Sequence, residues 1–237
     1  MSSSPRILSI YGTRPEAIKM APLIKAIEAD SSLESVVLVT AQHREMLDQV
    51  NELFGIQPDR DLNIMAQGQS LNQITARVIQ GVDKELVDLA PDAIVVQGDT
   101  TTVMASAIAA FNRSIPVVHL EAGLRSGNLF NPFPEEANRK LTGQIASLHL
   151  APTGRSRANL ENDGIDSNAI AVTGNTVIDA LQMAVDLQVE PEDQATRDYL
   201  GATGPKVLVT THRRENLGRS MESIGDALNE LATNRPD

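Results

Sequence analysis

The segment His119–Gly143, HLEAGLRSGNLFNPFPEEANRKLTG, decides how the rest of the chain is interpreted. It begins within an apolar run, Ile115–Leu120, which predicts a buried strand, and Glu121 follows at the carboxyl end of that strand. A glycine-containing loop comes next, and Pro134–Glu136 is typical of a helix start. Ligands of open parallel α/β sheets bind beyond the carboxyl ends of the strands, so the segment predicts three carboxylates directed at that edge.

Two of these three carboxylates have an ordinary alternative explanation. Glu135 and Glu136, taken alone, fit the preference of acidic side chains for the first turn of a helix. Glu121 is different, because a charge that closes an apolar strand and precedes a loop favours a functional role. The segment also supplies positive charge nearby, at Arg125, Arg139 and Lys140.

Asp99 has the same setting as Glu121. The run Ala93–Val96 predicts a buried strand, and the sequence QGDTTT follows it at positions 97–102. An Asp or Thr at this place can instead cap the next helix, and capping alone explains one of these residues. Two successive strands that bring acids to the same sheet edge nevertheless favour a site.

The N-terminal turn is a candidate anion site. Arg6–Tyr11 predicts the first strand, and Gly12–Glu16 leads from it into an amphipathic helix. Backbone N–H groups at such a turn can bind an anion, and Arg14 and Lys19 would add charge; a plain strand-to-helix loop is the alternative. The turn has neither the GxGxxG nor the GxxxxGK[ST] pattern, so it predicts neither NAD nor ATP.

Repeated alternation of strands and helices predicts an α/β fold with a Rossmann-like, doubly wound parallel sheet. Residues 1–187 are predicted to form this N-terminal domain, and the acidic, Gly- and Pro-containing stretch 188–206 a linker or crossover. Residues 207–237, with a strand at Val207–Val209 and then a helix, are predicted to be the first βα unit of a second α/β domain. Further strands are predicted at Ser35–Thr40, Leu62–Met65, Ser147–Ala151 and Ile170–Val172.

A basic loop follows the strand predicted at Val207–Val209. His212 and Arg213 stand there before a helix, where basic side chains suit a phosphate. A solvated turn is the alternative.

Composition narrows the class of partner. A net charge of -11 argues against nucleic acid and against an anionic membrane as partners. Cysteine is absent, which excludes disulfides and thiol chemistry. No apolar run approaches the roughly 18 residues of a membrane span, and the first residues lack a signal-peptide pattern. A cytoplasmic protein is therefore expected.

Five motifs stand in order along the chain: GTRPEAIKMAPL, QGDTTT, HLEAGLRSGN…PFPEEANRKLTG, TGNTVIDAL and THRRENLG. Their order and spacing, from about Arg6 to Arg219, resemble the non-hydrolysing UDP-N-acetylglucosamine (UDP-GlcNAc) 2-epimerases. The resemblance implies a fold like that of the B-type glycosyltransferases (GT-B), in which two Rossmann-like domains enclose a sugar nucleotide. It also implies interconversion of UDP-GlcNAc and UDP-N-acetylmannosamine, by elimination of UDP to 2-acetamidoglucal and re-addition of UDP.

The resemblance assigns roles to particular residues and partners. It implies catalytic roles for Asp99, Glu121, Glu135 and His212, and substrate binding by Arg14, Lys19 and Arg213. Which carboxylate serves which face of the sugar stays open. No metal and no cofactor are implied, since the leaving group supplies the driving chemistry. A homodimer formed through the N-terminal domain is expected.

The chain departs from the family in two ways. Regulated members bind a second UDP-GlcNAc through the loop that contains Gln42 and Glu45, a possible allosteric site. Glu45 and Gly68 stand where Gln and Arg are more usual, which argues against activation of this kind. Family chains are also longer, so we expect these 237 residues to bind the sugar nucleotide poorly. The alternatives are a truncated, non-catalytic sugar-nucleotide-binding remnant and a GT-B glycosyltransferase.

Overall fold

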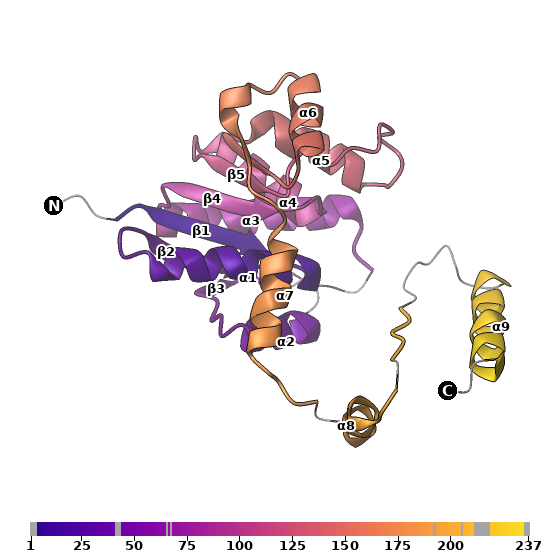
Figure 1. Cartoon of the computed structure of the whole chain (residues 1–237). Helices are drawn as coiled ribbons and strands as arrows, with labels where there is room; N and C mark the ends of the chain where they lie inside the picture. Colours follow the sequence, from indigo (N-terminus) through magenta and orange to yellow (C-terminus); the bar gives the residue numbers. More distant parts are fainter. Residues whose placement is uncertain are drawn as a thin grey trace. The chain divides into compact units, whose positions relative to one another are not determined.

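The computed structural model describes residues 4–40, 44–64, 66, 68–191, 193–204, 206–210 and 219–234. These residues fall into two compact units, Met1–Gln188 and Val189–Asp237 (Figure 1). The sequence predicts that the N-terminal domain ends at residue 187. The assignment of 188–206 as a linker and of 207–237 as the start of a UDP-binding domain remains a prediction.

The first unit contains one parallel sheet of seven strands in the order β3-β2-β1-β4-β5-β6-β7. The order reverses between β1 and β4, and at such a point a crevice opens at the carboxyl edge of the sheet. The predicted Rossmann-like, doubly wound sheet is therefore confirmed. The strands are β1 (Arg6–Tyr11), β2 (Glu34–Val39), β3 (Arg60–Asp61), β4 (Ala93–Gln97), β5 (Val117–Leu120), β6 (Leu148–Ala151) and β7 (Ile170–Val172).

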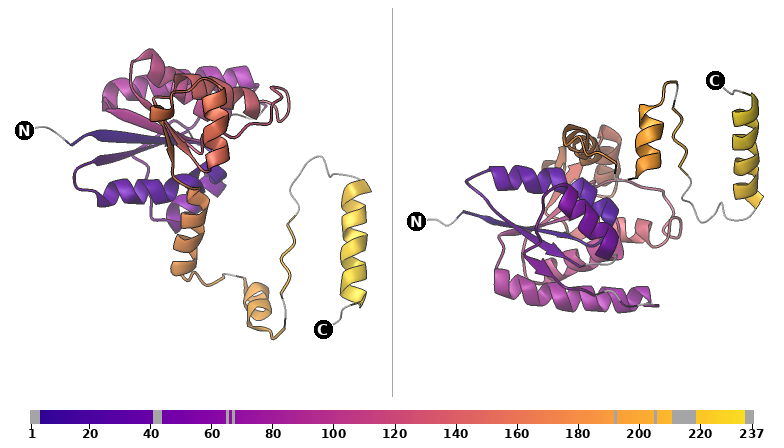
Figure 2. Two further views of the ribbon diagram at one scale, coloured as in Figure 1. Left: turned by 45° about the horizontal axis from the view of Figure 1, so that its top comes forward. Right: turned by 90° about the horizontal axis from the view of Figure 1, so that it is seen from below.

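Helices cover both faces of the sheet, as the view from below in Figure 2 shows. On one face, the buried side chains of β1 and β2 pack against α3 and α4, and α5 lies beside α4. On the other face, α1 packs against α2 and α7. The helices of this unit are α1 (Arg14–Ala29), α2 (Arg44–Leu53), α3 (Leu71–Leu89), α4 (Thr101–Asn112), α5 (Glu135–Ile145), α6 (Gly154–Asn162) and α7 (Thr176–Asp186), with a 3-10 turn at Ser167–Ala169.

The strand expected at Leu62–Met65 lies elsewhere. The strand is β3 at Arg60–Asp61, and Asn63 has a left-handed backbone with φ of 44°. An extended strand cannot continue through such a residue. The backbone N–H groups of Leu62 and Ile64 still donate to carbonyls of β2 and its end, Val39 and Thr40. Met65 lies outside the described residues.

The second unit contains α8 (Gln194–Gly201) and α9 (Arg219–Asn234). The strand expected at Val207–Val209 is not present, because described residues 206–210 have no regular secondary structure. Leu208 is 90% exposed. A strand forms only where a neighbour pairs with its N–H and C=O groups, and no such pairing is found for this segment in the described part of the chain.

Candidate active site

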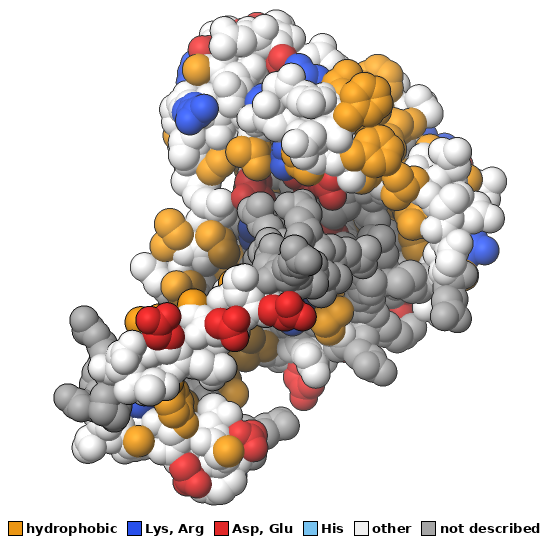
Figure 3. All heavy atoms as spheres, turned by 90° about the vertical axis from the view of Figure 1, so that its right-hand side faces the viewer, with side chains coloured by type: hydrophobic (Ala, Val, Ile, Leu, Met, Phe, Trp, Pro, Cys, Tyr) orange, Lys and Arg blue, Asp and Glu red, His pale blue; other side chains and the backbone are white. Residues whose placement is uncertain are grey.

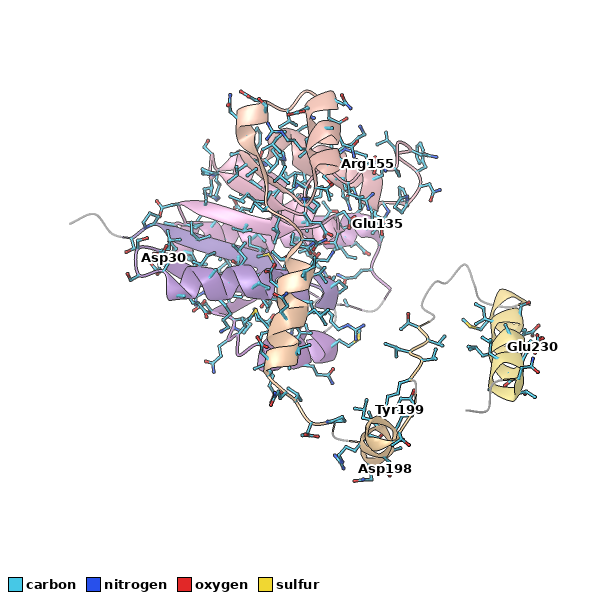
Figure 4. All side chains as sticks on the ribbon, in the orientation of Figure 1. Asp30, Glu135, Arg155, Asp198, Tyr199 and Glu230 are labelled. Carbon is cyan, nitrogen blue, oxygen red and sulfur yellow. The ribbon has the colours of Figure 1, made fainter. Side chains whose placement is uncertain are left out.

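A cavity of about 240 Å³ lies at the carboxyl edge of the sheet, at the point where the strand order reverses. Its lining comes from the residues after β1, β4 and β5 and from the helices α1 and α5. Figure 4 labels Glu135 at this end of the domain and Asp30, which follows α1, at the opposite end. The lining residues are Thr13, Pro15, Glu16, Lys19, Gln97, Gly98, Asp99, Thr100, Glu121, Leu124 and Arg139.

Glu121 is held in the cavity by three donors from separate parts of the chain. Lys19 Nζ lies 2.5 Å from Glu121 Oε2, and Gln97 donates to the same oxygen. Asn175, the N-cap of α7, donates from Nδ2 to Glu121 Oε1 over 3.0 Å. The backbone of Glu121 has φ of 62°, in the left-handed region that non-glycine residues rarely adopt. Strain of this kind is found mainly at functional sites.

Asp99 is bound by Arg139, which projects from α5. Arg139 Nε and Nη2 lie 2.8 and 2.6 Å from Asp99 Oδ2. Thr100, not Asp99, caps α4, because its hydroxyl accepts a hydrogen bond from the N–H of Val103. The capping alternative therefore applies to Thr100 and leaves the carboxylate of Asp99 in the cavity wall.

Glu136 is a structural residue. It is fully buried, and its carboxylate accepts the N–H groups of Ser126 and Gly127 over 3.0 and 3.4 Å. Arg139 Nη1 lies 3.0 Å from Glu136 Oε2. Burial by itself would raise the pKa of Glu136, but these bonds to Ser126, Arg139 and Gly127 outweigh it and the pKa is lowered. The residue fixes the loop that follows β5.

Glu135 opens onto a neighbouring cavity of about 180 Å³. Asp99 lines both cavities, the first together with Glu121 and the second together with Glu135. Glu135 is the first residue of α5, and Pro134 is its N-cap. Asp99, Glu121 and Glu135, the carboxylates to which the resemblance assigns catalytic roles, thus lie at one edge of the sheet.

Two of the nearby cations belong to a different cluster. Arg125 Nε and Lys140 Nζ lie 2.6 and 2.9 Å from the carboxylate oxygens of Asp163, at the end of α6. These ion pairs join the loop after β5 to α5 and α6. Arg125 and Lys140 therefore stabilise the walls of the site, and Arg139 and Lys19 are the basic side chains in its lining.

Two backbone N–H groups of the turn after β1 already have an acceptor within the chain. The N–H groups of Gly12 and Thr13 donate to Glu16 Oε2 over 2.7 and 2.9 Å, so the chain's own carboxylate fills the expected anion site. Burial raises the pKa of Glu16 despite these hydrogen bonds and a further one from Thr100. Arg14 is exposed at the first residue of α1 and is not among the residues that line the cavity.

Several contributors were not recognised from the sequence: Glu16, Gln97 and Asn175 as side chains in contact with the site. Each is polar and stands in one of the five motifs. The contacts of Gln97 and Asn175 with Glu121, and of Glu16 with Thr100, join residues that are 24 or more positions apart. Their positions next to strand and helix ends were the available signal.

The remaining candidates cannot be placed. Gln42, His212 and Arg213 lie outside the described residues, and of Glu45 only the backbone, in α2, is described. Within the described ranges, no group of three or more His, Asp or Glu side chains could hold a metal ion. In the same part of the chain, no helix is long and apolar enough to cross a membrane.

Comparisons with known proteins agree on one family. A family model described as UDP-N-acetylglucosamine 2-epimerase matches residues 25–237. The UDP-N-acetylglucosamine 2-epimerase of Salmonella typhimurium is 53% identical over 234 residues, which cover 96% of this chain and 62% of the relative. The chain thus spans about three fifths of the length of the curated relatives it matches.

Solved structures give the same result. A putative UDP-N-acetylglucosamine 2-epimerase from Listeria monocytogenes matches with a TM-score of 0.91 at 46% identity, over 100% of this chain and 61% of that one. The UDP-GlcNAc 2-epimerase of Neisseria meningitidis, in a crystal structure bound to UDP-GlcNAc, matches with a TM-score of 0.74 at 52% identity. That match covers 76% of this chain and 50% of the other.

Proposed function

Because the chain belongs to the UDP-N-acetylglucosamine 2-epimerase family, we propose that it carries the acid–base part of a site that interconverts UDP-GlcNAc and UDP-N-acetylmannosamine. The observation that supports this most strongly is the cavity in which Glu121 and Asp99 meet Lys19. Carboxylates can exchange a carbon-bound proton, and a cation can stabilise a departing diphosphate.

The proposed reaction has two balanced steps. In the first, a carboxylate takes the C2 proton, the C2–H electron pair forms a C1=C2 double bond, and the C1–O bond breaks so that UDP leaves with its electrons. In the second, a UDP oxygen attacks C1 of the resulting 2-acetamidoglucal while C2 receives a proton on the opposite face. Two faces require two proton-transfer groups, which suits carboxylates delivered by different strands.

Glu121 and Asp99 are the carboxylates proposed to move protons at C2. Glu121 is oriented by Lys19, Gln97 and Asn175, all acting as donors, so it presents acceptor oxygens to the cavity. Asp99 is oriented by Arg139 in the same wall. A fixed orientation matters because a proton-transfer group must lie within hydrogen-bond reach of the proton it moves. Glu135, in the neighbouring cavity, is the proposed third carboxylate.

Lys19 is the proposed contact for the leaving diphosphate. Lys19 lies in the cavity lining and pairs with Glu121. A diphosphate carries more negative charge than this carboxylate, so it can attract the Lys19 ammonium group more strongly. Arg14, His212 and Arg213 are carried over from the family motifs as further contacts for substrate or leaving group. The Neisseria meningitidis relative has been crystallised with UDP-GlcNAc, which supports the same substrate here.

Proton NMR of UDP-GlcNAc in D2O with the purified 237-residue chain tests the proposal. At a UDP-GlcNAc concentration high enough to offset the weak binding expected of these 237 residues, UDP-N-acetylmannosamine should form with deuterium at C2. Glu121→Gln should lower kcat by about 10²–10⁴-fold, the usual contribution of a proton-transfer group. Glu52→Gln, at an exposed position on α2, is the matched control and should behave as the unaltered chain does.

The outcomes separate the candidate functions. Free N-acetylmannosamine and UDP as products would indicate a hydrolysing reaction instead. If neither isotope exchange nor turnover occurs, the chain does not perform the proposed reaction by itself, and the non-catalytic interpretation is favoured. Exchange that persists in Glu121→Gln would contradict the role assigned to Glu121.

A further inference from the structure

Glu16 is a buried carboxylate in the cavity wall for which the proposed reaction has no use. It is 2% exposed and lines the cavity that also contains Asp99 and Glu121. Its Oε2 accepts the N–H groups of Gly12 and Thr13, and its Oε1 accepts the hydroxyl of Thr100 over 2.5 Å. A buried charged side chain is costly unless such partners satisfy it.

Helix capping explains only part of this arrangement. Thr13 and Glu16 form a capping box at the start of α1, which accounts for the bond from the Thr13 N–H. The bond from Thr100 is not part of any cap of α1, because Thr100 follows β4 and is 84 positions away. Glu16 therefore joins the turn after β1 to the turn after β4, on either side of the point where the strand order reverses.

Each of these two turns carries a residue of the proposed site. Asp99 directly precedes Thr100, and Lys19 lies one helical turn beyond Glu16 on α1. The turn after β1 lies close against the end of β2, because a Cβ atom at Gly12 would lie only 2.1 Å from Thr40 Oγ1. A displacement of the Thr100 turn relative to α1 would thus change the position of Asp99 relative to Lys19.

On the premise of the proposed function, we propose that Glu16 is a positioning residue: through Thr100 it sets the turn that carries Asp99 against the helix that carries Lys19. Glu16 acts through hydrogen bonds that its length and shape permit, and not by exchanging a proton with the substrate. The same carboxylate accepts the backbone N–H groups of Gly12 and Thr13, so these two groups are not available to a ligand phosphate.

Three substitutions of Glu16 separate positioning from proton transfer. Glu16→Gln keeps the shape: its carbonyl can accept both backbone N–H groups, and its amide can donate to Thr100 Oγ1. Glu16→Asp keeps the charge but is one methylene too short to reach both turns, and Glu16→Ala removes all three bonds. We expect Glu16→Gln to keep at least half of kcat, and the Asp and Ala variants to lose tenfold or more with KM changed less than threefold.

Thr100 provides a test from the other end of the bond. Thr100→Val removes the hydroxyl, whereas Thr100→Ser keeps it together with the cap of α4. Thr100→Val should lower kcat about as much as Glu16→Asp, and the two changes combined should cost little more than one alone, since residues that act as one unit are non-additive. Thr100→Ser should restore most of kcat. Additive losses would overturn the proposal.

Other outcomes are equally decisive. A loss in Glu16→Gln as large as in Glu16→Ala would make Glu16 a proton-transfer or charge-bearing group, and the positioning role would be wrong. If Glu16→Asp and Glu16→Ala fold and keep full kcat, Glu16 has only a structural role. Circular dichroism of each variant establishes that it is folded, and Thr100→Val carries the test if Glu16→Ala does not fold.

Failure of the proposed function can be recognised separately. If the unaltered chain gives no exchange, backbone amide NMR of the free protein decides the inference. Glu16→Asp should then shift the signals of residues 98–101 as well as those of residues 12–20, and Glu16→Gln should shift them less. Signals at 98–101 that stay in place in Glu16→Asp would overturn the positioning role whatever the chain catalyses.

Discussion

Glu121 illustrates how one residue combines a strained backbone with an ordered side chain. Its φ of 62° is unfavourable for a residue with a Cβ atom, by roughly 1–2 kcal/mol. The carboxylate is meanwhile held by Lys19, Gln97 and Asn175. The backbone turns sharply after β5, so the side chain is directed into the cavity while the chain continues into the loop.

The backbone strain at Glu121 can be measured with two substitutions that both remove the carboxylate. Glu121→Gly relieves the left-handed conformation, and Glu121→Ala retains it. We expect the free energy of unfolding of Glu121→Gly to exceed that of Glu121→Ala by about 1 kcal/mol. Urea unfolding followed by circular dichroism measures the difference. A Gly variant less stable than the Ala variant would show that this residue stores no strain.

His119 makes the stability of the fold depend on pH. It is 1% exposed on β5, and its Nε2 lies 2.7 Å from the carbonyl of Gly98. Burial lowers the pKa of His119 from 6.5 to about 4, and the neighbouring charges on His149 and Arg125 add to this, while the bond to Gly98 opposes it. The unfolded chain therefore binds a proton below pH 6.5 that the folded chain does not bind until about pH 4.

Acid should consequently destabilise the domain. Stability is fully present above pH 6.5 and falls as the pH drops towards 4, by about 3 kcal/mol from His119. His119→Gln keeps an N–H donor for the Gly98 carbonyl but does not titrate, so its unfolding free energy should fall less over the same range. Chemical unfolding at several pH values tests this. Equal pH dependence in both proteins would contradict it.

At the scale of elements, two glycines in the loop after β5 are expected to differ in importance. Gly123 and Gly127 both have positive φ, 92° and 80°. A Cβ atom at Gly123 would lie 2.2 Å from the backbone oxygen of Ser156 in α6, whereas at Gly127 nothing lies within 4 Å. Only Gly123 is therefore needed for packing as well as for conformation.

Alanine at these two positions gives a matched pair of variants. Gly127→Ala should cost about 1 kcal/mol, from the left-handed backbone alone. Gly123→Ala should cost about 1–3 kcal/mol more, because the backbone of α6 must move. Thermal or urea unfolding of both variants measures the contrast. Equal losses would mean that the contact between the loop and α6 is not tight.

The loop itself exposes apolar side chains at the carboxyl edge of the sheet. Phe130 and Phe133 are 79% and 61% exposed. Figure 3 looks onto this side of the molecule and shows hydrophobic side chains gathered on the upper part of the face. The loop that begins at the cavity residue Glu121 thus exposes apolar side chains to solvent.

At the scale of the whole molecule, the first unit should fold by itself. The buried hydrophobic clusters of the described residues all fall between Ile7 and Ala184. A fragment of residues 1–188 should therefore unfold cooperatively, with a midpoint close to that of the full chain. Urea unfolding of the fragment and of the full chain tests this. Loss of cooperativity would show that residues after 188 contribute to the core.

The expected homodimer is a second prediction at this scale. The resemblance implies association through the N-terminal domain, so we expect the chain, and the fragment of residues 1–188, to sediment as dimers. Sedimentation velocity at several concentrations provides the measurement. A monomer at all concentrations for the fragment, but not for the full chain, would place the contact in residues 189–237.

Sequence patterns predicted the sheet because buried strands and amphipathic helices have different periodicities. The carboxylates at the ends of β4 and β5 were likewise predictable, since parallel strands bring their ends to one edge. The periodic pattern did not predict Asn63, whose left-handed backbone ends β3, nor the irregular segment Val207–Val209, which lacks a pairing neighbour. Conformation at these places depends on contacts, and not on local preference.

The sequence by itself therefore determined the fold class, the family and the chemical type of the groups at the edge of the sheet. Only the tertiary structure decided which groups meet. Lys19 and Glu121 are 102 positions apart, and Thr100 and Glu16 are 84 apart. Such pairs arise from the order of strands across the sheet, which local periodicity does not encode.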